Sequence, residues 1–335
     1  MTRYVVVGAG AVGSALGGLM AQQGADVLLA ARGDHARAMA EHGLTVRCRD
    51  ATLTVPGQTQ LTLDDVLVLT TKTHQAEVAI SEWADVPVHA DDGVVGRAAD
   101  LPPIFTALNG VGRRGDRAAL FRAGFRGVRL VPDGHGLAGR GDRQGAPLRG
   151  VFHIGRYGGT ADPSGDATLL DGLTRDGEAA GRPIRRPEAV MAWKYRKLLA
   201  NVGNVLQALL GGITGPEDLQ EAVEAEARAI VGAAAVPIVG EEEARVGWQP
   251  EELSFRPVPG EQAELGGSSW QSLVRGTGTI ETDFLNGEIT LIARRLGRAA
   301  PINTRLTALA RRAARDGLTP GSIDVDQLRA QVLTP

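Results

Sequence analysis

The sequence predicts an α/β domain followed by an all-helical domain. In the first half of the chain, apolar segments alternate with segments of helical periodicity; the apolar segments are residues 4–7, 27–31, 66–70, 104–107 and 128–131. Because each is a continuous apolar run, they favour a parallel sheet covered by helices on both faces. After Pro187 the strand patterns fade, so the chain is expected to divide into domains of residues 1–186 and 187–335.

Local patterns indicate the remaining elements. Residues 151–156 continue the β pattern, and residues 166–180 are typical of a helix that ends near Gly181. Beyond the predicted boundary, helices are expected at residues 188–210, 216–236, 267–296 and 303–316. The stretch 112–150 is rich in glycine and arginine, contains Asp133 and His135, and fits no single element.

Composition limits the classes of function. The chain has 335 residues, 43% of them hydrophobic, and a formal net charge of -3, so it can bury a core but lacks the basic field of a nucleic-acid partner. Cys48 is the single cysteine, and the six histidines show no metal-ligand spacing, so no metal site is expected. A single cysteine is also typical of a reducing compartment, which favours a cytoplasmic location. The apolar start at residues 4–21 has only Arg3 as a basic residue before it and regularly spaced glycines. It is therefore expected to be folded structure, and no segment is expected to cross a membrane.

Two rare side-chain types cluster in one segment. Of the 36 basic residues only three are lysines, and the chain has five asparagines. Four of these rare residues lie close together, namely Lys194, Lys197, Asn201 and Asn204. A genome biased toward arginine explains the scarcity but not the clustering. Because a lysine amine can lose its proton at accessible pH whereas arginine cannot, the segment is a candidate for proton chemistry.

A glycine turn follows the first predicted strand. Residues 8–13 read Gly8-Ala9-Gly10-Ala11-Val12-Gly13 and precede a helical stretch. In this context Gly8 permits a tight turn, Gly10 lets a pyrophosphate approach the backbone, and Gly13 allows close packing of helix and strand. The alternative is a purely structural turn in a chain with 45 glycines. The context favours a Rossmann-type domain that binds a dinucleotide.

The end of the second predicted strand indicates which dinucleotide binds. Enzymes that use NAD place an acidic residue there, whereas this chain has Ala30-Ala31-Arg32, and an arginine accommodates the 2′-phosphate of NADP. NADPH is therefore expected, with Arg32 as its contact. Two alternatives stay open: Arg32 is one more solvated arginine, or Asp34 faces the ribose.

Polar side chains follow two further strands. Lys72 comes after residues 66–70, and Asn109, followed by Gly110, comes after residues 104–107. Because ligands bind at the carboxyl ends of parallel strands, Lys72 is placed for a cofactor charge, and Asn109 for a group that needs a donor and an acceptor. The Asn109-Gly110 pair is equally typical of a plain turn.

Residues 193–204 are expected to form one helix with a polar stripe. Lys197, Asn201 and Asn204 follow an i, i+4, i+7 spacing, and Lys194 lies one turn earlier on the same face. Reduction of a ketone by hydride leaves an alkoxide that needs a proton donor, and a lysine whose pKa is lowered by burial or by a like charge such as Lys194 can serve. Lys197 is therefore the predicted proton donor for the reduction of a ketone, with Lys194 as the alternative.

A second polar group lies further along the chain. Gly267-Ser268-Ser269-Trp270 is followed, on a predicted helix, by Glu281-Thr282-Asp283. Ser269 can hydrogen-bond a substrate carboxylate, and Glu281 can accept from a hydroxyl of substrate or ribose, or pair with the lysine. Serine at a helix start is equally typical of a cap.

Together these motifs resemble the ketopantoate reductases, also called 2-dehydropantoate 2-reductases. Beyond the glycine turn, the matching segments are Lys72-x-x-Gln75, Asn109-Gly110, Lys197-Leu198-x-x-Asn201, Ser268-Ser269, Glu281-x-Asp283, Asn286-Gly287 and Pro301-x-Asn303. The resemblance spans nearly the whole chain. It implies a Rossmann-type domain and a helical domain with the active site between them. It also implies NADPH as hydride donor and the reduction of a small 2-keto acid to a 2-hydroxy acid, with ketopantoate as the leading substrate of an enzyme of pantothenate biosynthesis.

The resemblance also implies roles for individual residues. Lys197 would donate the proton, and Asn201 and Ser269 would bind substrate. Lys72 would bind the cofactor, Asn109 both ligands, and Glu281 the nicotinamide ribose or a substrate hydroxyl.

The chain departs from the family pattern where the substrate would be held. The family has a second helical asparagine four residues after the first, where this chain has Val205. Asn204 comes one position earlier, which rotates it by about 100° around the helix. Asn204 is a candidate substrate contact instead of the missing asparagine. In the family a tryptophan lies two positions before the lysine, whereas here Trp193 lies four positions before Lys197. Three alternatives therefore stay open for the function: reduction of another keto acid, reduction of an imine, and an NADP-sensing role without activity. The sequence leaves the oligomeric state of the protein open, with a homodimer as one option.

Overall fold

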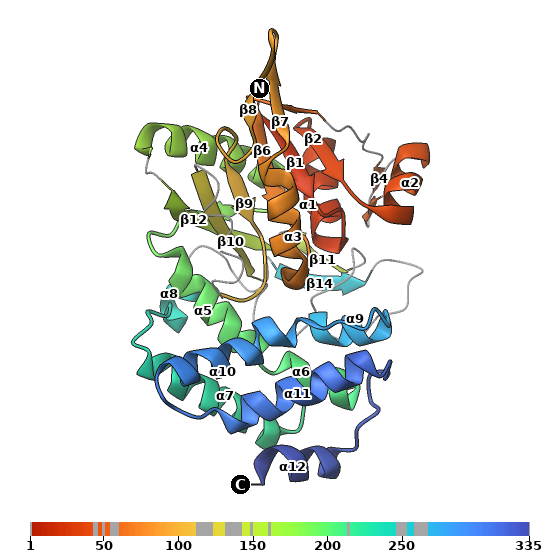
Figure 1. The fold of residues 1–335 in the computed structure, drawn as a ribbon, viewed down its shortest axis with the longest axis vertical. Helices are drawn as coiled ribbons and strands as arrows, with labels where there is room; N and C mark the ends of the chain where they lie inside the picture. Colours follow the sequence, from red (N-terminus) through yellow and green to blue (C-terminus); the bar gives the residue numbers. More distant parts are fainter. Residues whose placement is uncertain are drawn as a thin grey trace.

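A sheet occupies the centre of the N-terminal half of the chain, and helices make up most of the C-terminal half (Figure 1). The computed structural model describes residues 2–42, 46–48, 51–53, 60–111, 123–130, 143–147, 150–159, 162–212, 215–245, 253–257 and 267–334. Asp133, His135 and much of the stretch 112–150 lie outside the described residues.

The large sheet has seven strands in the order β13-β12-β10-β9-β6-β1-β2. They are β1 (Arg3–Val7), β2 (Asp26–Ala30), β6 (Asp65–Leu69), β9 (Ile104–Thr106), β10 (Ala123–Leu130), β12 (Val151–Gly159) and β13 (Ile184–Arg185). The five strands from β2 to β10 are parallel, as the apolar runs predict. The sheet also contains β12, for which the sequence predicted no direction and which runs antiparallel to β10. Of the residues between these two strands, the structure describes β11 (Arg143–Pro147) and Gly150.

Helices cover both faces of this sheet. Successive residues of a strand point to opposite sides, so an apolar strand presents apolar side chains on both faces. Tyr4 and Val6 of β1 pack in one cluster with residues of α1 (Ala11–Gln22) and α4 (Pro163–Ala179). Val5 and Val7 pack in another with residues of α3 (Thr73–Ala84). The short α2 (Gly33–His42) follows β2. Since β1 lies between β2 and β6, its carboxyl end is the switch point at which doubly wound sheets bind ligands.

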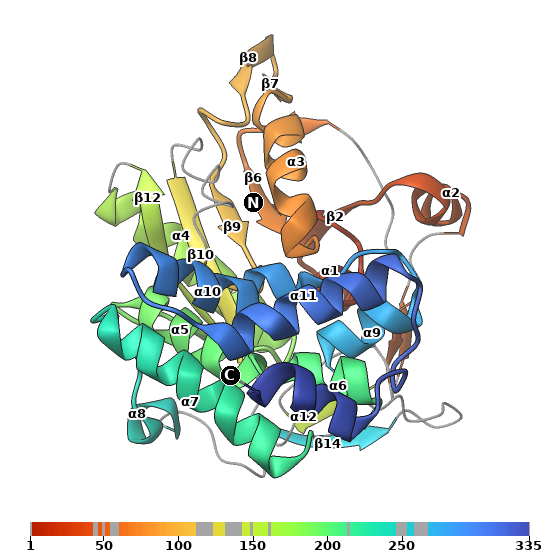
Figure 2. The same ribbon diagram turned by 60° about the horizontal axis from the view of Figure 1, so that its bottom comes forward.

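The helical half lies at one end of the sheet, and the turned view keeps α9, α10 and α11 beside that end (Figure 2). Its helices are α5 (Val190–Asn201), α6 (Asn204–Leu210), α7 (Glu217–Ala233), α8 (Glu241–Arg245), α9 (Ser268–Val274), α10 (Asn286–Arg295), α11 (Pro301–Arg315) and α12 (Val325–Leu333). One apolar core, which includes Leu206, Val223 and Leu306, joins most of them. The expected boundary at residues 186 and 187 falls between β13 and α5, and we retain it as a proposal.

The expected bounds of two helices in this half are wrong. The helix expected at residues 188–210 is broken at Val202 and Gly203. The helix expected at residues 267–296 is divided into α9, a 3-10 turn η3 (Glu281–Phe284) and α10, because Gly276 and Gly278 between them adopt positive φ. The expected helical character of this half is confirmed, with one exception among the described residues: β14 (Leu253–Pro257), which pairs with β11.

Two small sheets complete the described structure. β5 (Leu61–Thr62), β7 (Pro87–Ala90) and β8 (Gly93–Arg97) form one, and β3 (Val46–Cys48) pairs with β4 (Ala51–Leu53) in the other. Among the described residues, no helix combines the length and apolar character needed to cross a bilayer.

A stacked pair of rings joins the sheet to the helical half. His153 of β12 lies on Trp193 of α5, with ring centroids 3.7 Å apart and ring planes at 20°. Both side chains are buried, and a Cβ on Gly155 would lie 2.9 Å from Val190 Cβ, so strand and helix are in close contact. Burial, together with the nearby Arg185 charge, lowers the pKa of His153 to about 4. His153 is therefore neutral in the folded protein at neutral pH.

We expect the free energy of unfolding to decrease as the pH falls from about 6.5 to about 4. Over this range the unfolded chain binds a proton at His153 while the folded protein does not, so acid favours unfolding. The full difference corresponds to about 3 kcal/mol. His153→Phe keeps the stacked ring but does not titrate, so it should remove this contribution. Denaturant titrations of both proteins at neutral and acidic pH measure it, and an equal pH dependence in the two proteins would contradict the assignment.

Candidate active site

The glycine turn lies between β1 and α1, as predicted. Gly8 has a φ of 104°, a conformation that favours glycine. A Cβ on Gly13 would lie 2.3 Å from Gly8 O, so only glycine allows this packing of helix against strand. A Cβ on Gly10 would meet nothing within 4 Å, and no side chain caps the N-terminus of α1 there. The turn therefore fits a pyrophosphate over Gly10, at the positive end of α1.

Arg32 lies just beyond β2, on the exposed side of this turn. Its guanidinium forms an ion pair with Glu82 of α3, and its side chain is 65% exposed. Asp34, the alternative ribose contact, is engaged by Arg37. His35 Nε2 donates to Ala9 O at 2.8 Å, which attaches α2 to the glycine turn. Arg32 thus remains an accessible cation beside the predicted nucleotide site.

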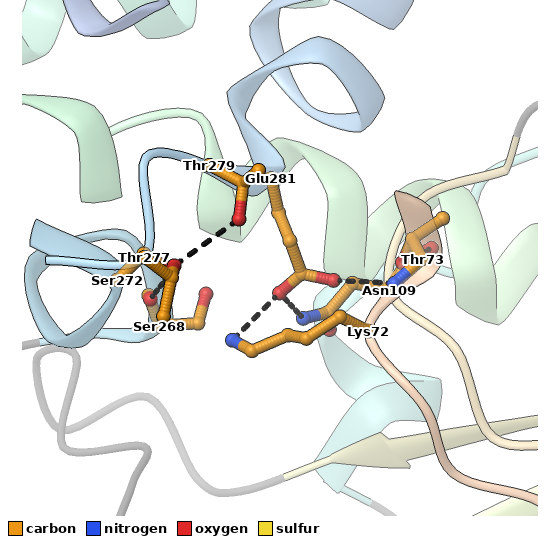
Figure 3. A network of polar contacts seen from close by, with 8 residues as sticks. All are labelled: Lys72, Thr73, Asn109, Ser268, Ser272, Thr277, Thr279 and Glu281. Carbon is orange, nitrogen blue, oxygen red and sulfur yellow. Dashed lines mark hydrogen bonds and ion pairs between the residues drawn. The ribbon is translucent and has the colours of Figure 1, made fainter. Parts of the chain in front are cut away.

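Glu281 is the centre of a polar cluster that joins the two halves of the chain (Figure 3). Its carboxylate accepts from Lys72 Nζ at 3.1 Å, from Thr73 N at 2.9 Å and from Asn109 Nδ2 at 3.3 Å. These donors follow β6 and β9, whereas Glu281 belongs to η3 and is only 2% exposed. The structure therefore brings together three of the predicted site residues, Lys72, Asn109 and Glu281, and places Glu281 on a 3-10 turn rather than on the expected helix.

The Glu281 carboxylate is ionised at neutral pH. Burial alone would raise the pKa of Glu281, but the Lys72 ammonium and the Thr73 N–H stabilise the charged form more, and the pKa lies below its ordinary value of 4.5. An ionised carboxylate is purely an acceptor, so Glu281 can receive further hydrogen bonds only from donors such as hydroxyl groups. Burial lowers the pKa of the neighbouring His74, which is consequently neutral at pH 7.

The Asn109-Gly110 pair serves both as a turn and as a polar contact. Gly110 has a φ of 75°, and a Cβ there would lie 2.5 Å from Phe284 O of η3. The Asn109 side-chain amide donates to Glu281, and the backbone carbonyl of Asn109 accepts from Thr73 Oγ1 at 3.1 Å. The turn packs against η3 and thereby holds the Asn109 amide against Glu281.

Lys194 and Lys197 lie one turn apart on α5 in different surroundings. Lys194 is 4% exposed, and its amine donates to Leu108 O at 2.8 Å. Since Leu108 precedes Asn109, this bond attaches α5 to the end of β9. Lys197 is half-buried. Lys197 is thus the less buried of the two lysines.

Asn201 ends α5 and Asn204 begins α6, and both are buried. The single helix expected to carry Lys197, Asn201 and Asn204 is divided at Val202 and Gly203, so Asn204 belongs to a separate helix. Helix α7 approaches so closely that a Cβ on Gly203 would lie 2.3 Å from Gln220 Nε2.

Asn204 lies beside the start of α9. A Cβ on Gly267 would lie 3.1 Å from Asn204 Oδ1, and Gly267 N donates to Gln207 Oε1 at 2.9 Å. Ser268 and Ser269 follow in the first turn of α9, where no side-chain cap is formed. The buried hydroxyls of both serines lack a hydrogen-bond partner in the described parts of the chain. Because buried polar atoms are normally paired, these hydroxyls are candidates for a ligand contact.

Sequence reasoning missed Thr73 and Gln207. Thr73 acts through its backbone N–H as well as its hydroxyl, and a backbone contact leaves no signal in residue type. Gln207 follows the conspicuous Asn201 and Asn204, but its partner is a backbone amide 60 residues away. The pairing of Glu281 with Lys72 was also not evident from spacing.

Known proteins share both the sequence pattern and the fold. Residues 4–127 match the family model described as ketopantoate reductase PanE/ApbA, and residues 189–314 match the model of its C-terminal part. The 2-dehydropantoate 2-reductase of Pyrococcus horikoshii is 28% identical over an alignment 334 residues long, which covers 96% of this chain and 99% of the relative.

Two solved structures have a similar fold. A PanE/ApbA family ketopantoate reductase from Ralstonia eutropha superposes with a TM-score of 0.67 at 24% identity, covering 94% of this chain and 99% of that one. D-mandelate dehydrogenase in complex with NADH superposes with a TM-score of 0.66 at 20% identity, covering 95% and 100%. Because the two family models together match most of the chain, it belongs to the ketopantoate reductase family of NADP-dependent oxidoreductases that act on CH–OH groups.

Proposed function

We propose that this protein reduces a small 2-keto acid to a 2-hydroxy acid with NADPH, and that ketopantoate is the leading candidate substrate. Family membership supports the reaction class and the cofactor. The observation that carries the proposal is the Glu281 cluster. It joins the strand ends that follow the glycine turn to the helical half, which carries Lys197.

The N-terminal half has the residues to hold NADPH, which would supply the hydride when bound. The backbone of Gly8, Ala9, Gly10, Ala11, Val12 and Gly13 would hold the pyrophosphate. Arg32 would contact the 2′-phosphate. Lys72 and Asn109 would contact the nicotinamide half, and the ionised Glu281 would accept from a ribose or substrate hydroxyl.

The helical half would bind and protonate the substrate. Lys197 would donate a proton from Nζ to the ketone oxygen as that oxygen gains negative charge. Asn201 and Ser269 would hold the carboxylate. The buried hydroxyl of Ser269, which has no hydrogen-bond partner among the described residues, supports this role. Asn204, which lies beside Gly267, would complete this side of the site.

A second candidate is a different 2-keto acid reduced by the same chemistry. The buried Val205 places an apolar side chain where the family pattern has an asparagine, which removes a polar contact from the substrate side. D-mandelate dehydrogenase, whose name specifies an aromatic 2-hydroxy acid, shares the fold.

An assay of NADPH oxidation separates these candidates. The purified protein is tested with ketopantoate and with aliphatic and aromatic 2-keto acids, and the products are identified by mass spectrometry. The highest kcat/KM with ketopantoate would support the leading candidate, and a higher value with another acid would assign that acid instead. If none of the acids were reduced, the proposed function would be refuted.

Replacing Arg32 with serine is expected to weaken NADPH binding by about ten- to a hundredfold while NADH binding changes little. Hydrogen bonds to charged groups contribute about 1.5–3 kcal/mol, and only NADPH carries the 2′-phosphate. Arg37, an exposed arginine of α2 that pairs with Asp34, is the matched control, and Arg37→Ser should leave both affinities unchanged. Fluorescence titrations measure both dissociation constants. An equal loss for the two nucleotides in Arg32→Ser would argue against the assignment.

A further inference from the structure

A buried asparagine of α10 contacts the break between α5 and α6. Asn286 is 0% exposed, and its Nδ2 donates to Val202 O at 2.9 Å and to Asn303 Oδ1 at 3.0 Å. Val202 directly follows Asn201 and lies two residues before Asn204. The Asn286 amide is thus bonded to the backbone that connects the two proposed substrate asparagines.

Val202 O needs this donor because it has lost its helical partner. In a continuous α-helix Leu206 N would donate to Val202 O, whereas here Leu206 N donates to Gly203 O at 3.0 Å. Val202 is fully buried, so its carbonyl is shielded from water, and an unpaired buried carbonyl is strongly unfavourable. Asn286 replaces the hydrogen bond that the break removes.

Asn286 is itself fixed by a buried network. Asn303 of α11 accepts from Asn286 and donates to Val223 O at 3.3 Å and Glu226 Oε1 at 2.8 Å, both on α7. The Glu226 carboxylate also accepts from the backbone N–H groups of Ile302 and Asn303. The break is therefore held in place relative to α7, α10 and α11.

The segment that carries Asn286 also carries Glu281. Residues 281–286 contact the cofactor-side cluster at their first residue and the α5–α6 break at their last. We propose that Asn286 is a positioning residue for the keto acid: by fixing Val202 O, it sets where Asn201 and Asn204 present their amides. This inference rests on the proposed function, because it assigns the role toward the substrate of that reaction.

The effect should fall on substrate binding rather than on the chemical step. Lys197 belongs to the continuous part of α5, and Glu281 is held by Lys72 and Thr73. Without the Asn286 donors, the asparagine amides shift while these groups stay in place. We expect the KM for the keto acid to rise on the order of tenfold, with kcat and the NADPH dissociation constant changed by less than about twofold.

Two variants of Asn286 and one control test this proposal. Asn286→Leu removes both donors at similar side-chain size, and Asn286→Ser is the milder variant if the leucine protein does not fold. Thr307→Val is the matched control, because Thr307 is also buried and its hydroxyl donates to Asn303 O at 2.7 Å rather than to the break. Steady-state kinetics, NADPH titration and hydrogen exchange of the amides of residues 203–206 are measured at equal folded fraction.

The outcomes separate positioning from general stability. Faster exchange at residues 203–206 together with a raised keto-acid KM in the Asn286 variants, and neither change in Thr307→Val, would support the proposal. Unchanged exchange, or faster exchange with an unchanged KM, would overturn it. If the unaltered enzyme reduces no keto acid, the proposed function fails and with it the substrate role of Asn286, while the exchange data still report whether Asn286 fixes the break.

Discussion

Replacing Lys197 with alanine is expected to lower kcat by about 10²- to 10⁴-fold while NADPH binding stays unchanged. The ketone oxygen must be protonated as hydride arrives, and Lys197 is the half-buried amine one turn before Asn201 on α5. Arginine cannot take over this step, because its pKa is too high for proton donation, so Lys197→Arg should be nearly as inactive. Single-turnover kinetics and nucleotide titration measure the two effects separately.

Lys194 is both the internal control and the competing candidate. Its amine is bonded to Leu108 O, so its loss should disturb the end of β9 without removing the proton donor. Lys194→Met is therefore expected to keep more activity than Lys197→Ala at equal folded fraction. The opposite order would transfer the proton-donor role to Lys194.

Glu281→Gln is expected to lower kcat/KM on the order of a hundredfold and to weaken NADPH binding. The carboxylate accepts from Lys72, Thr73 and Asn109, whereas a glutamine amide offers one oxygen and turns its own N–H groups toward donors. The Lys72 ammonium would lose its counter-charge in a largely buried cluster. Steady-state kinetics with both substrates varied measure the loss.

Asp283 is the matched control for Glu281. It lies two residues later in η3, and its partly exposed carboxylate pairs with Arg311 outside the cluster. Asp283→Asn should therefore retain nearly full activity. If both substitutions reduced activity equally, the loss would stem from the folding of η3 rather than from the Glu281 carboxylate.

Local sequence patterns were sufficient to predict the cofactor side of the fold. The strands β1, β6 and β9 are continuous apolar runs, and parallel topology alone predicts that Lys72 and Asn109, which follow two of them, lie at one edge of the sheet. Their common partner could not be derived in this way. Glu281 lies 209 residues from Lys72 and 172 from Asn109, and only the folded helical half brings it there.

The break between α5 and α6 has no local signal. Val202 and Gly203 keep helical dihedral angles, with φ values of -64° and -75°. The contacts at the break are distant in sequence: Gln220 of α7 packs against Gly203, and Asn286 bonds to Val202 O across 84 residues. Apolar periodicity alone therefore extends the helix through Asn204, whereas in the structure α5 ends at Asn201.

The scarcity of lysine was informative about position but not about partners. Lys72 lies in the Glu281 cluster, and Lys194 attaches α5 to the strand end before Asn109. The sequence predicts that Lys194 supplies a like charge to Lys197; the structure adds that the Lys194 amine donates to Leu108 O, just beyond β9. Residue type indicated which segments carry the lysines of the site, whereas tertiary contacts determine the hydrogen-bond partners of Lys72 and Lys194.

Chemical rescue of Lys197→Ala by small primary amines tests the central claim most directly. If Lys197 Nζ donates the proton, added alkylammonium ions should restore NADPH oxidation with the keto acid, in proportion to the concentration of the protonated amine. The same amines should leave the rate of the unaltered enzyme unchanged. A Lys197→Ala protein that binds NADPH normally but gains no activity from any small amine, or that needs none, would contradict the account.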